Sequence, residues 1–174
     1  MKKGIQLIKL AEEHTIAFKE EMQEAFLRGF QAYNKDDGEY SNQWQVLPDE
    51  DFYQSLRAEG AEAYEAIDAD GQRVGGAILS IHKTEGELAF LYVKVGVQSK
   101  GIGQAIWKAI EAMHPEVEVW ETCTPYFDRR NIHFYINRCG FHAVEFFNEH
   151  HPDPHMPEQF DQEDGLFKFE KRMK

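Results

Sequence analysis

The sequence predicts an α+β (mixed α/β) fold, in which a central, mostly antiparallel sheet of about six to seven strands is flanked by about four helices. Segments of alternating apolar residues follow one another closely and are separated by turn signals such as Asp68-Ala69-Asp70-Gly71, which indicates an antiparallel meander. Later in the chain a strand, an amphipathic helix and another strand follow in order. This pattern is typical of a crossover between parallel strands.

The first third of the chain is expected to contain a short strand and two helices. Residues 5–10 have the apolar pattern of a strand. The stretch from Ala11 to about Asn34 repeats its apolar residues at helical spacing, and a run rich in Asp and Gly ends it. Acidic residues after Pro48 predict a second helix, because carboxylates are favoured at the positive end of a helix.

The rest of the chain changes between the period of a strand and that of a helix. Residues 102–113 place their apolar side chains on one helical stripe that stops before Pro115. Residues 125–139 predict a further helix, which Gly140 closes. A long polar loop is expected over residues 148–165. Strands are expected at residues 61–68, 74–82, 87–95, 116–123, 141–147 and 166–172.

Size and composition limit the class of protein. The chain of 174 residues fits a single domain over residues 1–174. It has no long apolar run, so neither a signal peptide nor a membrane span is expected. Two cysteines are too few for a disulfide framework, which predicts a cytoplasmic setting. The net charge of −12 argues against nucleic-acid binding and would suit a cationic substrate, although it also serves solubility alone.

The turn Gln98–Gly103 lies between a strand and the first turn of the amphipathic helix. The first amides of a helix have no internal partner and point outward at the positive end of the helix dipole. Glycines let a phosphate approach these amides and Lys100 adds a charge, so a pyrophosphate is the expected ligand. The Walker and dinucleotide patterns do not fit, because Ile102 follows Gly101 and Ile106 stands where a third glycine would be.

Together with the strand before it, the segment Leu91–Gly103 resembles the acetyl-CoA-binding motif of the GNAT superfamily, Gln/Arg-x-x-Gly-x-Gly/Ala after a strand. The order of the elements over residues 60–147 is similar to that family as well. The resemblance implies a GNAT-like fold, acetyl-CoA as the cosubstrate, and transfer of its acetyl group to an amine.

The resemblance also implies which residues bind acetyl-CoA. Main-chain groups of Val93 and Val95 would bind the pantetheine arm, and the Val93 amide would stabilise the oxyanion of the tetrahedral intermediate. Asn131 matches a CoA-contacting asparagine at the start of the next helix, although its spacing is displaced. The pyrophosphate would be held by the backbone amides of Gln98, Ser99, Lys100, Gly101, Ile102 and Gly103.

The reaction needs an acid for the departing thiolate, and the family commonly uses a tyrosine. Tyr135 is the candidate, but the family spacing before Gly140-Phe141 would place that tyrosine at Ile136. Either the helix carries an extra residue near its end, or Tyr135 belongs to the core. Tyr126 and Tyr92 are the alternative acids.

The reaction also needs a base that accepts the proton of the attacking ammonium. Glu121 is the preferred base, because it lies near the carboxyl end of its strand, where open sheets bind ligands. Glu87 on the preceding strand is the second candidate. Either carboxylate could also be an ordinary solvated or paired group.

Two further groups of residues suggest other chemistry. Cys123 or Cys139 could be the nucleophile of a ping-pong mechanism, but no His or Asn spacing supports its activation, so direct transfer in a ternary complex is expected. A proline-broken, histidine-rich stretch suggests either a metal site or a solvated loop, and no metal is expected. This group consists of His142, His150, His151, His155 and Asp153.

The expected acceptor is the primary amine of a small molecule. A peptide or protein amine is one rival hypothesis, and a non-catalytic acetyl-CoA-binding module is the other. Nucleic-acid and membrane partners are not expected, and a homodimer is left open.

Overall fold

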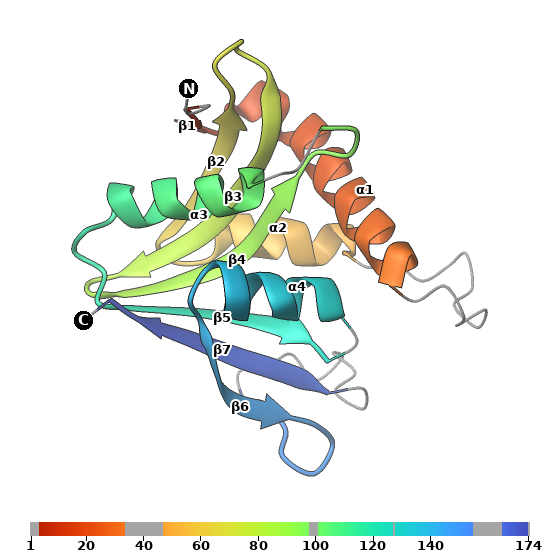
Figure 1. Cartoon of the computed structure of the whole chain (residues 1–174), viewed down its shortest axis with the longest axis vertical. Coiled ribbons are helices and arrows are strands. Elements are labelled where there is room, and N and C mark those ends of the chain that lie inside the picture. Colours follow the sequence, from red (N-terminus) through yellow and green to blue (C-terminus); the bar gives the residue numbers. More distant parts are fainter. Residues whose placement is uncertain (1–3, 34–46, 98–100, 127, 155–164, 174) are drawn as a thin grey trace.

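A computed structural model describes residues 4–33, 47–97, 101–126, 128–154 and 165–173. Seven strands form one sheet in the order β1-β2-β3-β4-β5-β7-β6 (Figure 1). Of the described strand pairs, β4–β5 is parallel and the others are antiparallel. The strands are β1 Gln6–Lys9, β2 Ala61–Ile67, β3 Arg73–His82, β4 Glu85–Val93, β5 Val119–Pro125, β6 His142–Phe147 and β7 Leu166–Arg172. The predicted fold class is confirmed.

Helices cover both faces of this sheet. A short 3-10 turn at Glu12–His14 leads into the first helix. A π-helical turn at Phe134–Arg138 continues the last one. The α-helices are α1 Thr15–Tyr33, α2 Asp49–Arg57, α3 Ile102–Met113 and α4 Arg129–His133. In the described part of the chain, no helix is long and apolar enough to span a membrane.

The central strand β3 shows how the two layers of core arise. Its side chains alternate between the faces, so Ala77 and Leu79 pack with one apolar cluster and Ile78 with the other. On one face Phe18 of α1 meets the edge of Tyr92 with 5.3 Å between ring centroids. On the other face Trp107 of α3 packs against Trp120 with ring centroids 5.1 Å apart. Because both faces are covered, β3 is buried along most of its length.

The parallel strands β4 and β5 stay together for a short distance only. Their register runs from Glu85↔Val119 to Glu87↔Glu121, although both strands continue further. Immediately beyond this point β4 contains a bulge, because Ile78 pairs with Phe90 while Leu79 pairs with Leu88. The two strands then diverge, and α4 lies beside the opening between them (Figure 1).

Some predicted boundaries were wrong. The strand expected over residues 87–95 ends at Val93, and the one expected from residue 116 begins at Val119. The helix expected over residues 125–139 begins at Arg129, because Pro125 still pairs with Leu166 in the sheet and Asp128 caps the helix.

Candidate functional site

A cleft lies at the wide end of the opening between β4 and β5. Its walls come from the second half of α1, the end of β4, the start of α3 and the start of α4. The lining residues are Ala25, Phe26, Gly29, Leu91, Tyr92, Val93, Gly103, Asp128, Arg130, Asn131 and Phe134. The sequence motif at Gly103 and the candidate residues Val93 and Asn131 therefore meet in one place.

The end of β4 turns a backbone amide toward this cleft. The Lys94 amide donates to the Val74 carbonyl on β3 at 2.8 Å. Since successive amides of a strand point to opposite sides, the N–H of Val93 points away from β3, toward the opening. Val95 lies past the strand, in a turn that the Val97 amide closes onto the Lys94 carbonyl at 3.2 Å, with Gly96 at φ 89°. Val95 is thus placed in the turn and not on the strand.

The first turn of α3 presents free amides next to the cleft. Gly101 is the N-cap residue with φ 79°, a left-handed conformation that glycine adopts without strain. Its carbonyl accepts from Ala105 at 2.9 Å, and no side chain of the described residues caps the helix. The amides of Ile102 and Gly103 are consequently available to an anion. The other predicted pyrophosphate ligands, Gln98, Ser99 and Lys100, lie outside the described residues.

Gly103 also lets α3 begin close to its neighbours. A Cβ atom at this position would lie 3.0 Å from the Phe134 ring and 3.5 Å from Val93. The absence of a side chain here therefore permits the contact between α3 and the π-helical turn and keeps the floor of the cleft open.

The start of α4 forms a polar wall of the cleft. The Asp128 carboxylate accepts from the backbone amide of Asn131 at 3.1 Å and from its Nδ2 at 2.8 Å. Burial raises the pKa of Asp128, while the hydrogen bonds from Asn131 oppose the rise. Sequence reasoning named Asn131 but missed Asp128 and Arg130. An Asp three residues before an Asn, at a helix start, was the available signal for Asp128.

Tyr135 lies on the π-helical turn that follows α4. The Cys139 amide donates to the Phe134 carbonyl at 3.0 Å, a spacing of five residues that accommodates one extra residue in the helix. The Tyr135 side chain is 5% exposed and packs against Phe141 and Phe169. The structure shows both features together, because the helix carries an extra residue and the Tyr135 side chain is buried, and the role of Tyr135 as the acid stays a prediction.

The other aromatic candidates have different surroundings. Ile136, at the position that the family spacing gives to the tyrosine, is 37% exposed, and Tyr126 is 57% exposed. The buried Tyr92 hydroxyl donates to Glu21 at 3.1 Å. Burial, followed by the charge of Glu21, raises the pKa of Tyr92.

The two candidate bases are neighbours. Glu87 and Glu121 are register partners in the last pair of the parallel ladder, where the strands begin to separate. Glu121 forms an ion pair with Lys168, with 3.4 Å between Oε1 and Nζ. Glu87 keeps an exposed surface, but the surrounding strands shield its carboxylate enough to raise its pKa, and the charge of Glu121 adds to the rise.

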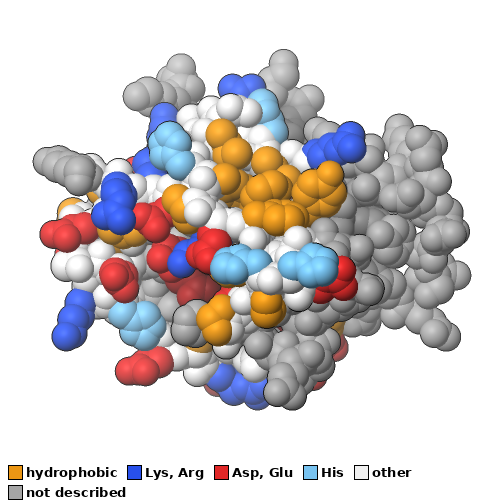
Figure 2. Space-filling view, turned by 90° about the horizontal axis from the view of Figure 1, so that it is seen from below, with side chains coloured by type: hydrophobic (Ala, Val, Ile, Leu, Met, Phe, Trp, Pro, Cys, Tyr) orange, Lys and Arg blue, Asp and Glu red, His pale blue; other side chains and the backbone are white. Residues whose placement is uncertain are grey.

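The histidine and cysteine side chains show a different arrangement. Seen from below, acidic side chains and histidines gather in the middle of the surface beside a group of hydrophobic side chains (Figure 2). His151 pairs with Glu145 at 2.8 Å and stacks on Phe147. Within the described ranges no group of three His, Cys, Asp or Glu residues could hold a metal ion, and His155 lies outside those ranges. Desolvation and nearby carboxylates raise the pKa of Cys123 to about 12, which disfavours its reactive thiolate.

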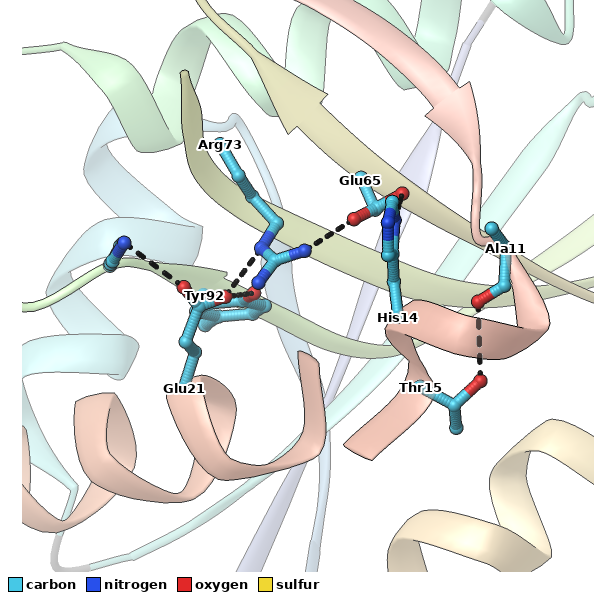
Figure 3. Close-up of polar contacts among 8 residues, drawn as sticks. Ala11, His14, Thr15, Glu21, Glu65, Arg73 and Tyr92 are labelled. Carbon is cyan, nitrogen blue, oxygen red and sulfur yellow. Dashed lines mark hydrogen bonds and ion pairs between the residues drawn. The ribbon is translucent and has the colours of Figure 1, made fainter. Parts of the chain in front are cut away.

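A polar network fixes α1, one wall of the cleft, to the sheet. Arg73 of β3 lies between Glu21 of α1 and Glu65 of β2, and donates to both carboxylates at 2.5 Å (Figure 3). His14 contacts the second oxygen of Glu65 at 3.1 Å. Lys94, next to the cleft, pairs with Glu21 at 3.2 Å. Burial lowers the pKa of Arg73, and the carboxylates of Glu21 and Glu65 raise it. The net effect is a rise, so the guanidinium stays charged.

A mixed sheet that opens between parallel strands, with free helix amides at the mouth of the opening, defines the class of acyltransferases that use an acyl-CoA thioester. Comparison with known proteins agrees with this class. The model of the acetyltransferase (GNAT) family matches residues 10–141. The chain belongs to this family.

Several relatives resemble the chain over most of its length. The uncharacterized protein YrkN of Bacillus subtilis (strain 168) is 44% identical over 138 residues, which are 74% of each chain. A GNAT family acetyltransferase from Elizabethkingia anophelis, solved with acetyl-CoA bound, aligns with TM-score 0.65 at 13% identity over 99% of this chain and 100% of that one. Spermidine N-acetyltransferase from Vibrio cholerae, in complex with CoA and spermine, aligns with TM-score 0.63 at 14% identity over 97% and 95% of the chains.

Proposed function

We propose that this GNAT acetyltransferase transfers the acetyl group of acetyl-CoA to a primary amine of a small molecule, by direct attack in a ternary complex. The observation that carries the proposal is the opening between β4 and β5, which leads to the uncapped start of α3. The structural relatives with bound acetyl-CoA, and with CoA and spermine, have the same fold and support this proposal.

In this proposal the cleft binds acetyl-CoA mainly through backbone groups. The pyrophosphate lies on the amides of Gly101, Ile102 and Gly103, continued by those of Gln98, Ser99 and Lys100. The pantetheine arm follows the end of β4 past Val95 and Val93, with Asn131 on the opposite wall. The Val93 amide then donates to the thioester carbonyl and stabilises the oxyanion, a contribution of about 3 kcal/mol for a well-placed donor.

Glu87 and Glu121 act together in accepting the proton of the amine. Glu121 forms an ion pair with Lys168, and the charge of Glu121 helps to raise the pKa of Glu87. A carboxylate with a raised pKa is a stronger base, so Glu87, and not the Glu121 preferred from the sequence, takes the proton while Glu121 attracts the ammonium. Because Glu87 is six residues before Val93 on β4, the proton reaches it through water molecules in the opening. The net charge of −12 favours the same kind of acceptor.

Tyr135 is the proposed acid. An ordinary phenol, with a pKa of about 10, already keeps its proton at neutral pH, and Tyr135 donates this proton to the departing thiolate. Burial raises the pKa of Tyr135, which makes the phenol a weaker acid until the thiolate charge develops beside it. The raised pKa of Cys123 supports direct attack over a covalent acetyl-enzyme.

Calorimetry with acetyl-CoA, followed by thiol release with an acceptor panel, tests the proposal. The panel contains polyamines, amino sugars, aryl amines and peptides, and we expect turnover with a small amine. Absence of binding at millimolar acetyl-CoA would overturn the binding site. Turnover with peptides alone would replace the small-molecule acceptor by a peptide amine.

A further inference from the structure

The hydrogen bond that ends the parallel ladder between β4 and β5 comes from a side chain. After the last register pair, Glu87↔Glu121, the next residues are Leu88 and Thr122. The Thr122 hydroxyl donates to the Leu88 carbonyl oxygen at 2.8 Å. Both residues are almost fully buried, with 1% of Leu88 and 2% of Thr122 exposed. The bulge of β4 follows directly, at the point where the strands separate.

Where the strands separate, the Leu88 carbonyl loses its backbone partner on β5, and the Thr122 hydroxyl takes the place of that partner. A buried carbonyl needs a hydrogen-bond donor, and within a ladder the neighbouring strand supplies a backbone amide. That arrangement holds the two strands at about 4.8 Å. A side-chain donor satisfies the carbonyl without fixing the backbones at this spacing. The strands can therefore part immediately beyond Leu88 without leaving its carbonyl unpaired.

Thr122 also connects this point to the proposed acid. The Tyr135 phenol, from the π-helical turn, lies close enough to the Thr122 side chain to be affected by it. One buried hydroxyl thus contacts a backbone carbonyl of β4 and lies near a tyrosine whose ring packs against Phe169 of β7. The Leu88 carbonyl belongs to one edge of the opening, and Tyr135 belongs to the turn that follows α4 beside it.

A second threonine on β5 provides a comparison. Thr124 follows two residues later, so its side chain is on the same face of the sheet, and it is equally buried at 2% exposure. It pairs with Phe167 of β7, beyond the point where β4 has diverged. If only packing mattered, replacing Thr122 or Thr124 would have the same effect on activity. If the hydrogen bond at the opening matters, replacing Thr122 has the larger effect.

We propose that Thr122 is a positioning residue, which fixes the point where β4 and β5 separate and thereby aims the end of β4, with the Val93 amide, at the reacting thioester. This inference rests on the proposed acetyl transfer. It adds a residue that does not touch the substrate and acts through the backbone of β4.

Three variants test the proposal: Thr122→Val, which keeps the shape and removes the donor, Thr122→Ser, which restores the donor, and Thr124→Val as the matched control. We expect Thr122→Val to lower kcat about tenfold, corresponding to one lost hydrogen bond. The Kd for CoA should change less than about threefold, because the pyrophosphate site on α3 is untouched. Thr122→Ser should recover kcat to within about threefold, and Thr124→Val should leave it unchanged within the same margin.

Hydrogen exchange of the amides of residues 88–93, without ligand, gives a second readout that does not depend on catalysis. We expect Thr122→Val to accelerate this exchange and Thr122→Ser and Thr124→Val to leave it near the wild-type rate. If Thr122→Val does not fold, Thr122→Cys keeps the side-chain size with a much weaker donor.

Equal effects of Thr122→Val and Thr124→Val, or failure of Thr122→Ser to restore kcat, would overturn the positioning role. Unchanged exchange in Thr122→Val would overturn it even in a protein that does not turn over acetyl-CoA. Absence of acetyl-CoA binding by the wild type, with altered exchange in Thr122→Val, would instead overturn the proposed function and leave the structural part of this inference standing.

Discussion

Glu87 and Glu121 are the same type of residue in adjacent positions, yet their surroundings give them different properties. Lys168 lies 3.4 Å from Glu121, and the pKa of Glu87 is raised by desolvation and by Glu121 itself. A carboxylate whose pKa is raised beside a second carboxylate is a common arrangement at sites of proton transfer. The strand register, which brings them together, determines this difference.

Replacing the proposed base tests its role. Glu87→Gln should lower kcat/KM by about 10²-fold or more, because the amide cannot accept the proton. In the wild type kcat/KM should rise with pH through a pKa above the ordinary value of glutamate, since the base must lose its proton before it acts. This rise should disappear from the pH profile of the variant.

Glu85→Gln is the matched control, because Glu85 is an exposed glutamate on the same strand. Its kcat/KM should stay within about twofold of wild type. A Glu87→Gln enzyme that keeps the wild-type rate and pH profile would exclude Glu87 as the base.

The proposed acid can be tested with little change in packing. Tyr135→Phe retains the ring that contacts Phe141 and Phe169 and removes the hydroxyl. We expect kcat to fall by about 10²-fold for loss of a general acid. Tyr126→Phe, at a tyrosine that is 57% exposed, should have no effect. A full rate in Tyr135→Phe, measured by thiol release, would leave Tyr135 with a structural role alone.

At the scale of single elements, the start of α3 needs a residue that adopts a left-handed conformation, and in the proposed function it also binds the pyrophosphate of CoA. Gly101 has φ 79° and Gly71, in the turn between β2 and β3, has φ 81°. A Cβ atom at either position would meet no atom within 4 Å, so the two sites differ in location and not in steric freedom. They form a matched pair for separating backbone strain from CoA binding.

We expect Gly101→Ala and Gly71→Ala each to lower the free energy of unfolding by about 1 kcal/mol, the cost of a left-handed conformation for alanine. Gly101→Ala alone should also weaken CoA binding about tenfold, because the shifted turn moves the amide donors. Denaturant unfolding and calorimetry measure the two effects. Equal CoA affinities of the two variants would argue against a pyrophosphate site at this turn.

The elements also show what sequence reasoning can reach. The meander, the crossover and the helix at residues 102–113 were predicted, because their apolar periods and glycine turns are local signals. The apolar run predicts that β4 continues to Val95, but the strand ends at Val93. The reason is that the turn closed by the Val97 amide already begins at Lys94. The π-helical turn hardly changes the apolar pattern of the sequence. Its one sign there is the spacing of Tyr135 before Gly140, which is one residue longer than in the family.

The candidate site was less predictable than the elements, for a physical reason. Val93, Gly103 and Asn131, which the motif and its context named, all line the cleft, and their role in binding acetyl-CoA stays a prediction. The adjacency of Glu87 and Glu121 depends on the register of a parallel pair, and no tight turn fixes that register because a crossover through α3 joins the two strands. The contributions of Asp128 and Arg130 depend on where α4 starts, which was misplaced by several residues.

For the whole molecule, the charge of −12 should influence which amines reach the site. A negative surface attracts a cationic acceptor, and this attraction weakens as the Debye length shortens from about 30 Å at 0.01 M salt to about 8 Å at 0.15 M. We therefore expect KM for a polyamine acceptor to rise with ionic strength. KM for an uncharged aryl amine is the control and should stay nearly constant. Parallel salt dependence of both acceptors would exclude electrostatic attraction.

The opening between β4 and β5 has a consequence for the order of events. A sheet is a single layer of strands, so groups on either face can lie beside the point where two of its strands diverge. Glu87 and Glu121 lie beside the narrow end of the gap and the free amides of α3 beside the wide end. In the proposed reaction the amine would approach from the side of the two glutamates and acetyl-CoA from the side of α3, so that neither would block the other. If the proposed ternary complex forms in this way, no binding order is obligatory, and calorimetry should detect binding of acetyl-CoA and of the amine each to the free enzyme.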